Sequence, residues 1–415
     1  MANSERFAVL ILQGTADYDS IGAFDREVAR IIRAMTDFDV LMLDLNDHDN
    51  LNPRLKKMLD DYPNRIVAVF SFSGFGIELV DANKTNIWQK LGLPMLTFLL
   101  DHPGYILARH KTATPAVMRI YPNRDFLGFH RDYIRAPYRT SFCAWGAMSF
   151  GRQPYPREPK PGETPLIILP KSGANPAELE AKWKLLPDIM QRVIRDAVDY
   201  YWGETPRSGP VNTSVLAAAD AAGLELRNDL PLFSFFAAEL DFYIRRRKTD
   251  LMLRALLPLP VKIYGKGLEY IDCANARAQV LPPIQFDELI NLIFKGFAVI
   301  SMNPNIDHEC HDRPYIALGS GALPISDINP WWAENFPDLL PYSYDFRDRS
   351  IVGAVELALA DPVKAASVAW QASQRQCRTR TFEHTVTDML ALAAMHSYFT
   401  FRFKTPNGAY IKYAE

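Results

Sequence analysis

Short, continuously apolar segments recur along this chain, and amphipathic or polar stretches separate them. A strand that is covered on both faces reads as an unbroken apolar run, whereas a strand with one face in water alternates. The runs therefore predict parallel sheets with helices on both faces, which is the doubly wound α/β class. In the first 170 residues the runs are 7–12, 40–45, 66–72, 95–100, 117–121, 140–144 and 166–169.

An interruption follows the first series of strands. Residues 151–165 are dense in Pro, Gly and charge, which is typical of an exposed connection. From about 177 to 257 the apolar residues recur at near-helical spacing, so this region reads as a helical insert or bridge. Strand-like runs then resume, and the chain closes with helices; the runs are 261–264, 298–302 and 323–326, and the helices about 350–360, 361–375 and 381–398.

The length of the chain predicts two domains. At 415 residues it exceeds the roughly 250–300 at which a single core stops growing. We expect an N-terminal Rossmann-like domain at 1–170, a helical bridge at 171–257 and a C-terminal Rossmann-like domain at 258–415 that includes the terminal helices.

The composition of the chain disfavours two classes of binding partner, nucleic acids and membranes. Charged residues make up 23% of the chain and the formal net charge is -2, so nothing draws the whole molecule toward nucleic acid or an anionic membrane. The four cysteines are scattered without a CxxC pair, and no apolar run approaches the length of a membrane span. We therefore expect a cytoplasmic protein with no nucleic-acid partner and at most peripheral membrane contact. The basic run 245–248 is expected to be a solvated helix face, with a membrane-surface role as the alternative.

Three loops follow strands of the first domain and should face one cleft, because ligands of doubly wound sheets bind beyond the carboxyl ends of the strands. The first two supply candidate acceptor-side residues, and the third supplies Asp101 and His102 as candidates for acid/base chemistry at an acceptor hydroxyl. The alternative is that Asp101 caps a strand end and His102 is an ordinary loop residue. The other acceptor-side candidates are Gln13, Gly14, Gly74 and His130.

The segment 302–327 reads as a strand, a polar loop, a short helix, a glycine turn and a second strand. Arg313 lies near the start of that helix, where a guanidinium and free helical N–H groups suit a phosphate. Glycine at 319 and 321 would allow a ligand to approach the backbone closely. The alternative is that this segment is a helix C-cap with a solvated polar loop. The donor-site candidates are Gly265, Lys266, Asn303, His311, Arg313, Gly321 and Asp327.

These residues resemble a motif of the CgeB-like GT-B glycosyltransferases, whose second domain carries the pattern R-x-x-E-A-x-x-x-G before an apolar strand. Here the pattern runs from Arg313 to Gly321, with Ala317 in place and Ile316 where the family has glutamate. Residues 259–267 are similar to the family's strand and glycine loop at the donor phosphates, and residues 98–103 and 380–384 are similar to two further segments. The resemblance spans both domains.

The resemblance implies a GT-B fold and a hexosyl- or related transferase. Such an enzyme moves a sugar from a nucleotide-sugar donor to a glycan, lipid-linked or protein acceptor, in cell-envelope or protein glycosylation. It also implies an interdomain active site without a metal or a cofactor. Glu309, Asp312 or Asp327 are candidates to replace the missing glutamate. Two alternatives stay open: a nucleotide-sugar epimerase on the same scaffold, and a non-catalytic binding or scaffold protein, which Ile316 favours.

Overall fold

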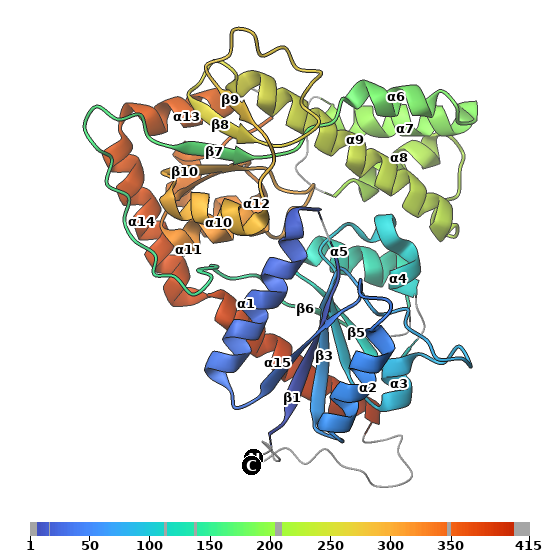
Figure 1. The fold of residues 1–415 in the computed structure, drawn as a ribbon. Helices are drawn as coiled ribbons and strands as arrows, with labels where there is room; N and C mark the ends of the chain where they lie inside the picture. Colours follow the sequence, from blue (N-terminus) through green and yellow to red (C-terminus); the bar gives the residue numbers. More distant parts are fainter. Residues whose placement is uncertain are drawn as a thin grey trace. The chain divides into compact units, whose positions relative to one another are not determined.

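The computed structural model describes residues 6–15, 17–111, 114–136, 139–203, 210–346 and 350–401. The chain forms two compact units (Figure 1). Unit 1 is built from residues 1–144 together with 382–415, and unit 2 from residues 145–381.

Unit 1 contains a six-stranded sheet in the order β2-β1-β3-β4-β5-β6, with every neighbouring pair parallel. The apolar runs explain the arrangement, because β3 is buried along its whole length and β1 along all but its last residue. The strands are β1 (Ala8–Gln13), β2 (Asp39–Asp44), β3 (Ile66–Phe72), β4 (Met95–Phe98), β5 (Val117–Tyr121) and β6 (Thr140–Phe142).

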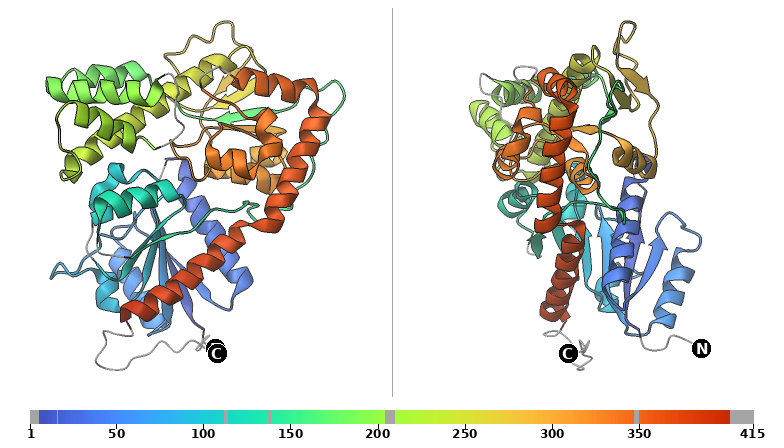
Figure 2. Two further views of the ribbon diagram at one scale, coloured as in Figure 1. Left: turned by 180° about the vertical axis from the view of Figure 1, so that it is seen from behind. Right: turned by 90° about the vertical axis from the view of Figure 1, so that its left-hand side faces the viewer.

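The last helix of the chain belongs to this first unit. Helix α15 (Phe382–Phe401) packs against β3 and β4, and both views in Figure 2 show it running along the sheet. Its His396 Nε2 lies 2.9 Å from the carbonyl oxygen of Ala116, just before β5. The other helices of unit 1 are α1 (Ser20–Met35), α2 (Leu51–Asp61), α3 (Ile87–Leu91), α4 (Leu107–Lys111) and α5 (Arg124–Phe129), with short helical turns at Asp17–Asp19, Pro103–Ile106 and His130–Ile134.

Unit 2 contains a five-stranded parallel sheet in the order β11-β10-β7-β8-β9. The chain moves outward in one direction from β7 through β8 to β9, and then returns to the other side of β7 for β10 and β11. The strand order therefore reverses between β7 and β10. The strands are β7 (Ile167–Pro170), β8 (Val261–Tyr264), β9 (Gln279–Leu281), β10 (Ala298–Ser301) and β11 (Leu323–Ser326).

An unusually long connection joins the adjacent strands β7 and β8, and its described residues form four helices where a single crossover helix would suffice. The longest of them, α9, begins after Asp229, whose side chain accepts a hydrogen bond from the Leu232 N–H at 3.1 Å. The helices of unit 2 are α6 (Pro176–Trp183), α7 (Asp188–Trp202), α8 (Asn212–Ala221), α9 (Leu230–Leu256), α10 (Phe286–Lys295), α11 (Asp312–Ser320), α12 (Pro330–Asn335), α13 (Ile351–Ala360) and α14 (Pro362–Thr379), with a 3-10 turn at Pro337–Tyr342.

The doubly wound α/β class is confirmed, and the structure places two elements differently from the expectation. The run at 166–169 is β7, the central strand of the second sheet, although we expected it to end the first domain. The helix expected to close the second domain is α15, which returns to unit 1. Strand β9 was not predicted, because it is a largely exposed edge strand and has no apolar run in the sequence.

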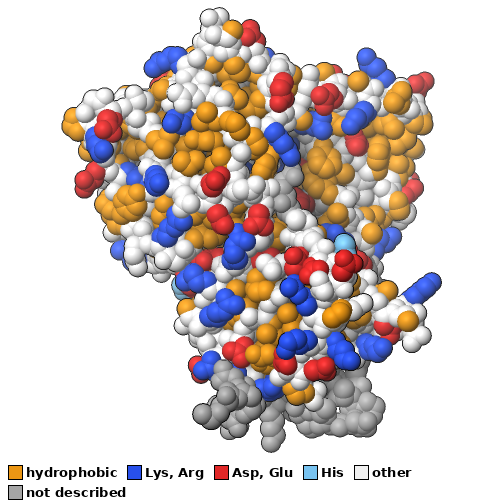
Figure 3. Space-filling model, in the orientation of Figure 1, with side chains coloured by type: hydrophobic (Ala, Val, Ile, Leu, Met, Phe, Trp, Pro, Cys, Tyr) orange, Lys and Arg blue, Asp and Glu red, His pale blue; other side chains and the backbone are white. Residues whose placement is uncertain are grey.

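The helices that the structure describes include none with both the length and the apolar character needed to cross a membrane. Acidic and basic side chains are interspersed over the face drawn in Figure 3, in keeping with the formal net charge of -2.

Candidate nucleotide-binding site

The reversal of strand order in unit 2 marks its candidate binding site. In open α/β sheets ligands bind beyond the carboxyl ends of the strands at such a point. The strands on either side of the reversal are β7 and β10, and the residues that follow them are Lys171 and Met302. The loops that begin there both belong to unit 2.

The loops after β7 and β8 hold one another. The Gly173 N–H donates to the Lys266 carbonyl at 2.9 Å, and the two loops approach so closely that a Cβ at Gly265 would lie 2.2 Å from the Lys171 carbonyl oxygen. Gly267 has a positive φ of 70°. The glycines at 265 and 267 therefore serve loop-to-loop packing, while the Lys266 side chain between them is exposed.

The loop after β10 is held by buried amides. The Asn303 backbone N–H donates to Asp327 Oδ1 at 2.6 Å, and the side-chain Oδ1 of Asn303 accepts from the His311 N–H at 2.8 Å. Both Asn303 and Asp327 are almost fully buried. Burial raises the pKa of Asp327 to about 6, against the opposing influence of Lys248. Asn303 and Asp327 thus fix the loop and the start of α11, which is a positioning role.

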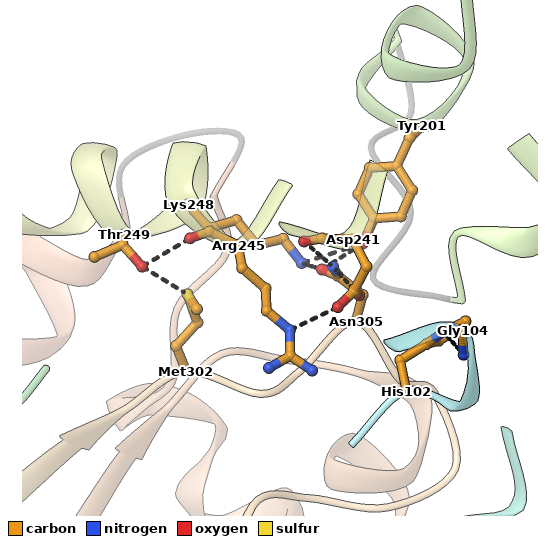
Figure 4. A network of polar contacts seen from close by, with 9 residues as sticks. All are labelled: His102, Gly104, Tyr201, Asp241, Arg245, Lys248, Thr249, Met302 and Asn305. Atoms are coloured by element: carbon orange, nitrogen blue, oxygen red, sulfur yellow. Dashed lines mark hydrogen bonds and ion pairs between the residues drawn. The ribbon is translucent and has the colours of Figure 1, made fainter. Parts of the chain in front are cut away.

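A second amide of the same loop is fixed from α9 (Figure 4). Asn305 Oδ1 accepts hydrogen bonds from Lys248 Nζ at 2.8 Å and from the Tyr201 hydroxyl at 3.0 Å. Its Nδ2 donates to Asp241 Oδ1 at 2.7 Å, and the same carboxylate pairs with Arg245 Nε at 2.8 Å. Every hydrogen-bonding atom of the Asn305 amide thereby has a partner.

This network corrects the expectation for the basic run 245–248. Lys248 is only 3% exposed, and the Arg245 side chain is 24% exposed and ion-paired, so these two residues do not form a solvated or membrane-facing surface. Burial lowers the pKa of Lys248, while Asp327 and Asp241 act to raise it. The sequence could not predict this, because a run of Lys and Arg does not show whether each side chain faces water or a buried carboxylate.

Cations gather where β7 ends and α11 begins. Lys171 follows β7, and burial together with the charges of Arg313 and Arg245 lowers its pKa to about 7. Arg313 lies in the first turn of α11, and its buried Nε has no hydrogen-bond partner among the residues that the structure describes. Helix N-termini add free N–H groups that favour anions. Like charges brought together at such a point are suited to bind a polyanion.

Position 316, where the CgeB-like pattern has glutamate, holds a core residue. Ile316 is completely buried in α11 and belongs to the core of unit 2. Glu309 is buried too, and its carboxylate accepts from the Tyr315 hydroxyl at 2.7 Å and from the Cys310 N–H at 3.0 Å. Asp312 contacts the His311 ring; burial acts to raise its pKa, but His311 and Arg313 lower it to about 2.

Gly321 lies at the opposite end of α11 from Arg313. It follows the helix with a φ of 84°, and a Cβ there would come within 2.3 Å of the Tyr155 carbonyl oxygen. Gly319 likewise packs against the backbone of Met148. The structure thus gives these glycines a helix-capping and packing role and does not bring Gly321 to the cation cluster.

Two of the acceptor-side candidates of unit 1 lie on loops that flank the reversal in its own strand order, between β1 and β3. Gly14, which follows Gln13 at the end of β1, packs on the Phe75 ring, because a Cβ there would lie 2.4 Å away. Gly74 has a φ of 77° and faces Arg109, whose Nη1 donates to the Ser73 carbonyl at 2.6 Å. The structure brings these loops together at the carboxyl edge of the sheet.

Asp101 and His102 follow β4 and differ in environment. Asp101 is exposed. His102 is 2% exposed; its Nδ1 accepts from the Gly104 N–H at 3.1 Å, and its ring packs edge-on against Phe126 and Phe129. The His102 geometry is that of a cap for the turn that follows, which is the structural alternative described above. The assignment of Asp101 as a catalytic base stays a prediction.

His130 is joined to two other buried side chains. Its Nδ1 lies 2.8 Å from the Tyr121 hydroxyl, which in turn lies 2.7 Å from His110 Nδ1. Burial, reinforced by Arg119, lowers the pKa of His130 to about 4. The three rings form a buried cluster at the carboxyl end of β5, so His130 is neutral near pH 7 and enclosed.

Comparisons with known proteins identify the fold. No protein-family model matches the chain, and no curated sequence matches it significantly. Among solved structures, sucrose-phosphate synthase from Thermosynechococcus elongatus superposes with a TM-score of 0.53 at 10% identity, covering 94% of this chain and 99% of that one. An alpha-glucosyltransferase in complex with UDP and a 13-mer DNA containing an HMU base gives 0.52 at 10% identity, covering 94% and 100%.

The two parallel sheets and these neighbours define a two-domain, Rossmann-like GT-B α/β fold. Within that fold, the second unit carries a cation cluster at its topological switch point.

Proposed function

We propose that this chain is a glycosyltransferase that takes a sugar from a nucleoside-diphosphate sugar and transfers it to an acceptor hydroxyl. The observation that carries the proposal is the placement of Lys171 and Arg313 at the strand-order reversal of unit 2, on the loop that follows β7 and in the first turn of α11. A diphosphate matches this cluster, because a guanidinium binds phosphate oxygens bidentately and helical N–H groups add to it. The resemblance of 313–321 to the CgeB-like motif supports the same assignment.

The chemistry would be displacement of the nucleoside diphosphate by the acceptor oxygen. Negative charge grows on the leaving diphosphate as the bond to the sugar breaks, and fixed cations aimed at that charge stabilise the transition state. Lys171 and Arg313 would supply this stabilisation without a metal or a cofactor. The loops that carry them are held by Gly265 and Asn303, so little reorganisation is needed when the donor binds.

The donor proposal is tested by calorimetry with UDP, GDP, ADP and their sugar conjugates, with and without EDTA. Metal-independent binding that is lost in Arg313→Ala supports it. A chain that binds none of these ligands refutes it. Incubation of the bound nucleotide sugar with glycan, lipid-linked, protein and nucleic-acid acceptors then names the acceptor class, for which we propose one of the first three.

A second candidate is a GT-B protein that binds a nucleotide sugar without transferring it. The observation that favours it is the burial of Ile316 where the family pattern has glutamate. Donor binding with neither hydrolysis, epimerisation nor transfer would support this candidate, and release of nucleoside diphosphate in the presence of an acceptor would exclude it.

A further inference from the structure

The long connection between β7 and β8 brings a helix to the candidate site that an ordinary crossover would not. Helix α9 passes the loop that leaves β10, and the Thr249 hydroxyl lies 3.9 Å from Met302 Sδ at the start of that loop. One face of the helix holds Asp241, Arg245 and Lys248, which are spaced by one turn each. All three belong to the network drawn in Figure 4.

The two cations of this face differ in their surroundings. Lys248 is enclosed, and its ammonium donates to Asn305 and to the Tyr201 hydroxyl, at 2.8 and 3.2 Å. Arg245 keeps 24% of its side chain exposed and pairs with Asp241 through Nε. In Figure 4 the two terminal nitrogens of its guanidinium point away from Asp241. Lys248 therefore serves the loop, whereas Arg245 reaches the accessible side of the network.

Arg245 is tied to the loop that leads to Arg313. Its partner Asp241 accepts a 2.7 Å hydrogen bond from Asn305 Nδ2 in that loop, and the loop continues to the first turn of α11. Alongside burial, the charge of Arg245 also acts to lower the pKa of Lys171, while nearby carboxylates act to raise it. Cations from the loop after β7, the first turn of α11 and the middle of α9 therefore belong to one region. Guanidinium groups suit such a place because they stay charged at any working pH and bind phosphate in two-point geometry.

We propose that Arg245 is a third anion-binding residue of this site, contacting a phosphate group of the donor, and that Asp241 orients its guanidinium for that contact. Lys248 is a positioning residue, because it holds the loop after β10 through Asn305. The proposal rests on the proposed function, since it assigns a further contact to the same diphosphate. It makes the helical connection between β7 and β8 part of the donor site.

The chain offers a matched control for the test. Arg254 lies on the same helix and pairs with Asp250 through Nε at 3.0 Å, four residues apart, as Arg245 pairs with Asp241. Its side chain is 51% exposed, and it lies beyond the network. Both Arg245→Gln and Arg254→Gln remove an i,i+4 ion pair from helix α9, although the Asp241 carboxylate is more buried than that of Asp250, at 2% against 19% exposed. The nucleoside measurement therefore serves to separate a structural effect of Arg245→Gln from the loss of a phosphate contact.

The experiment measures binding of UDP, GDP and ADP by calorimetry to the wild type, Arg245→Gln, Arg254→Gln and Arg313→Ala, and binding of the matching nucleosides by competition. We expect Arg245→Gln to weaken the diphosphate roughly 10- to 100-fold, as for a lost charged hydrogen bond, and to leave the nucleoside unchanged. Arg254→Gln should match the wild type with both ligands.

The outcomes separate this inference from the proposed function. If the wild type binds no nucleoside diphosphate, the proposed function fails. If Arg313→Ala weakens the diphosphate and Arg245→Gln does not, the donor site stands and Arg245 is outside it. If Arg245→Gln weakens diphosphate and nucleoside equally, its effect is structural, and the phosphate contact is refuted.

Discussion

The buried ammonium of Lys248 donates a 2.8 Å hydrogen bond to Oδ1 of Asn305, and in this way helix α9 holds the loop that leaves β10. The loop continues to the first turn of α11, where Arg313 lies. A lysine from the basic run thereby supports the candidate nucleotide site from inside the protein.

Replacing this lysine should be costly. Lys248→Met removes the ammonium that donates to Asn305 and that faces the buried carboxylates of Asp241 and Asp327, although Asp241 keeps its pair with Arg245. Removing one partner from a buried charge network of this kind costs about 3–5 kcal/mol. Urea denaturation, followed by the protection of unit 2 amides against hydrogen exchange, measures the loss. The control is Lys57→Met, which removes an exposed pair with Asp61 and should change stability little. A loss from Lys248→Met no greater than that of the control would contradict the role of the network.

Arg313→Ala should weaken binding of a nucleoside diphosphate without unfolding unit 2. A charged hydrogen bond contributes about 1.5–3 kcal/mol, which corresponds to roughly 10- to 150-fold in dissociation constant. Calorimetry gives the affinity, and thermal unfolding without ligand gives the control. Unchanged affinity in a folded variant would remove Arg313 from the site.

Binding of the diphosphate should depend on pH through Lys171. The pKa of its ammonium is about 7 in the free protein, and a bound anion raises it, so binding takes up a proton above pH 7. Affinity is then expected to fall by up to about tenfold per pH unit between pH 7 and 9, where the phosphates, with a second pKa near 6, are already ionised. Lys171→Arg, which stays charged, should bind with no such slope, and a slope that persists in this variant would assign it to another group.

The stability of unit 1 should be greatest near pH 6.5. Burial lowers the pKa of His130 and His396 to about 4 and that of His110 well below its usual value, so the unfolded chain binds more protons and stability falls as the pH drops from 6.5 toward 4. Asp25 has the opposite sign, because burial raises its pKa from 3.8 to about 8 and its contribution to stability is lost progressively as the pH rises from 3.8 to about 8. Below pH 6.5 three histidines outweigh one carboxyl, by about 1.4 kcal/mol per pH unit for each group.

Hydrogen exchange in β3 to β5, followed from pH 4.5 to 8.5, measures this profile. Asp25→Asn should abolish the decline between pH 6.5 and 8 and leave the acid side intact. A profile that is flat above pH 6.5 in the wild type would show that the Asp25 carboxyl is ionised in the folded state.

Local apolar patterning determined much of the fold. Strands β1 and β3 could be predicted from the sequence because both faces of the sheet are covered there. A continuously apolar run of that length is expected for a buried parallel strand. The helical character of about 177–257 and the loops at Gly14, Gly74 and Gly265 could also be predicted, since glycine is typical of close backbone approach or a positive φ. Such signals are contained within a few neighbouring residues.

Only the tertiary structure decided which strand pairs with which and which charges meet. Strand β7 is as apolar as the strands before it, and nothing in its letters shows that its partners are β8 and β10, far along the chain. Lys171 was overlooked, and Lys248 was assigned to solvent because its partners lie far away in the sequence: Tyr201 comes from α7 and Asn305 from the loop after β10. Burial and pKa depend on those long-range contacts, and an amino-acid type alone carries no record of them.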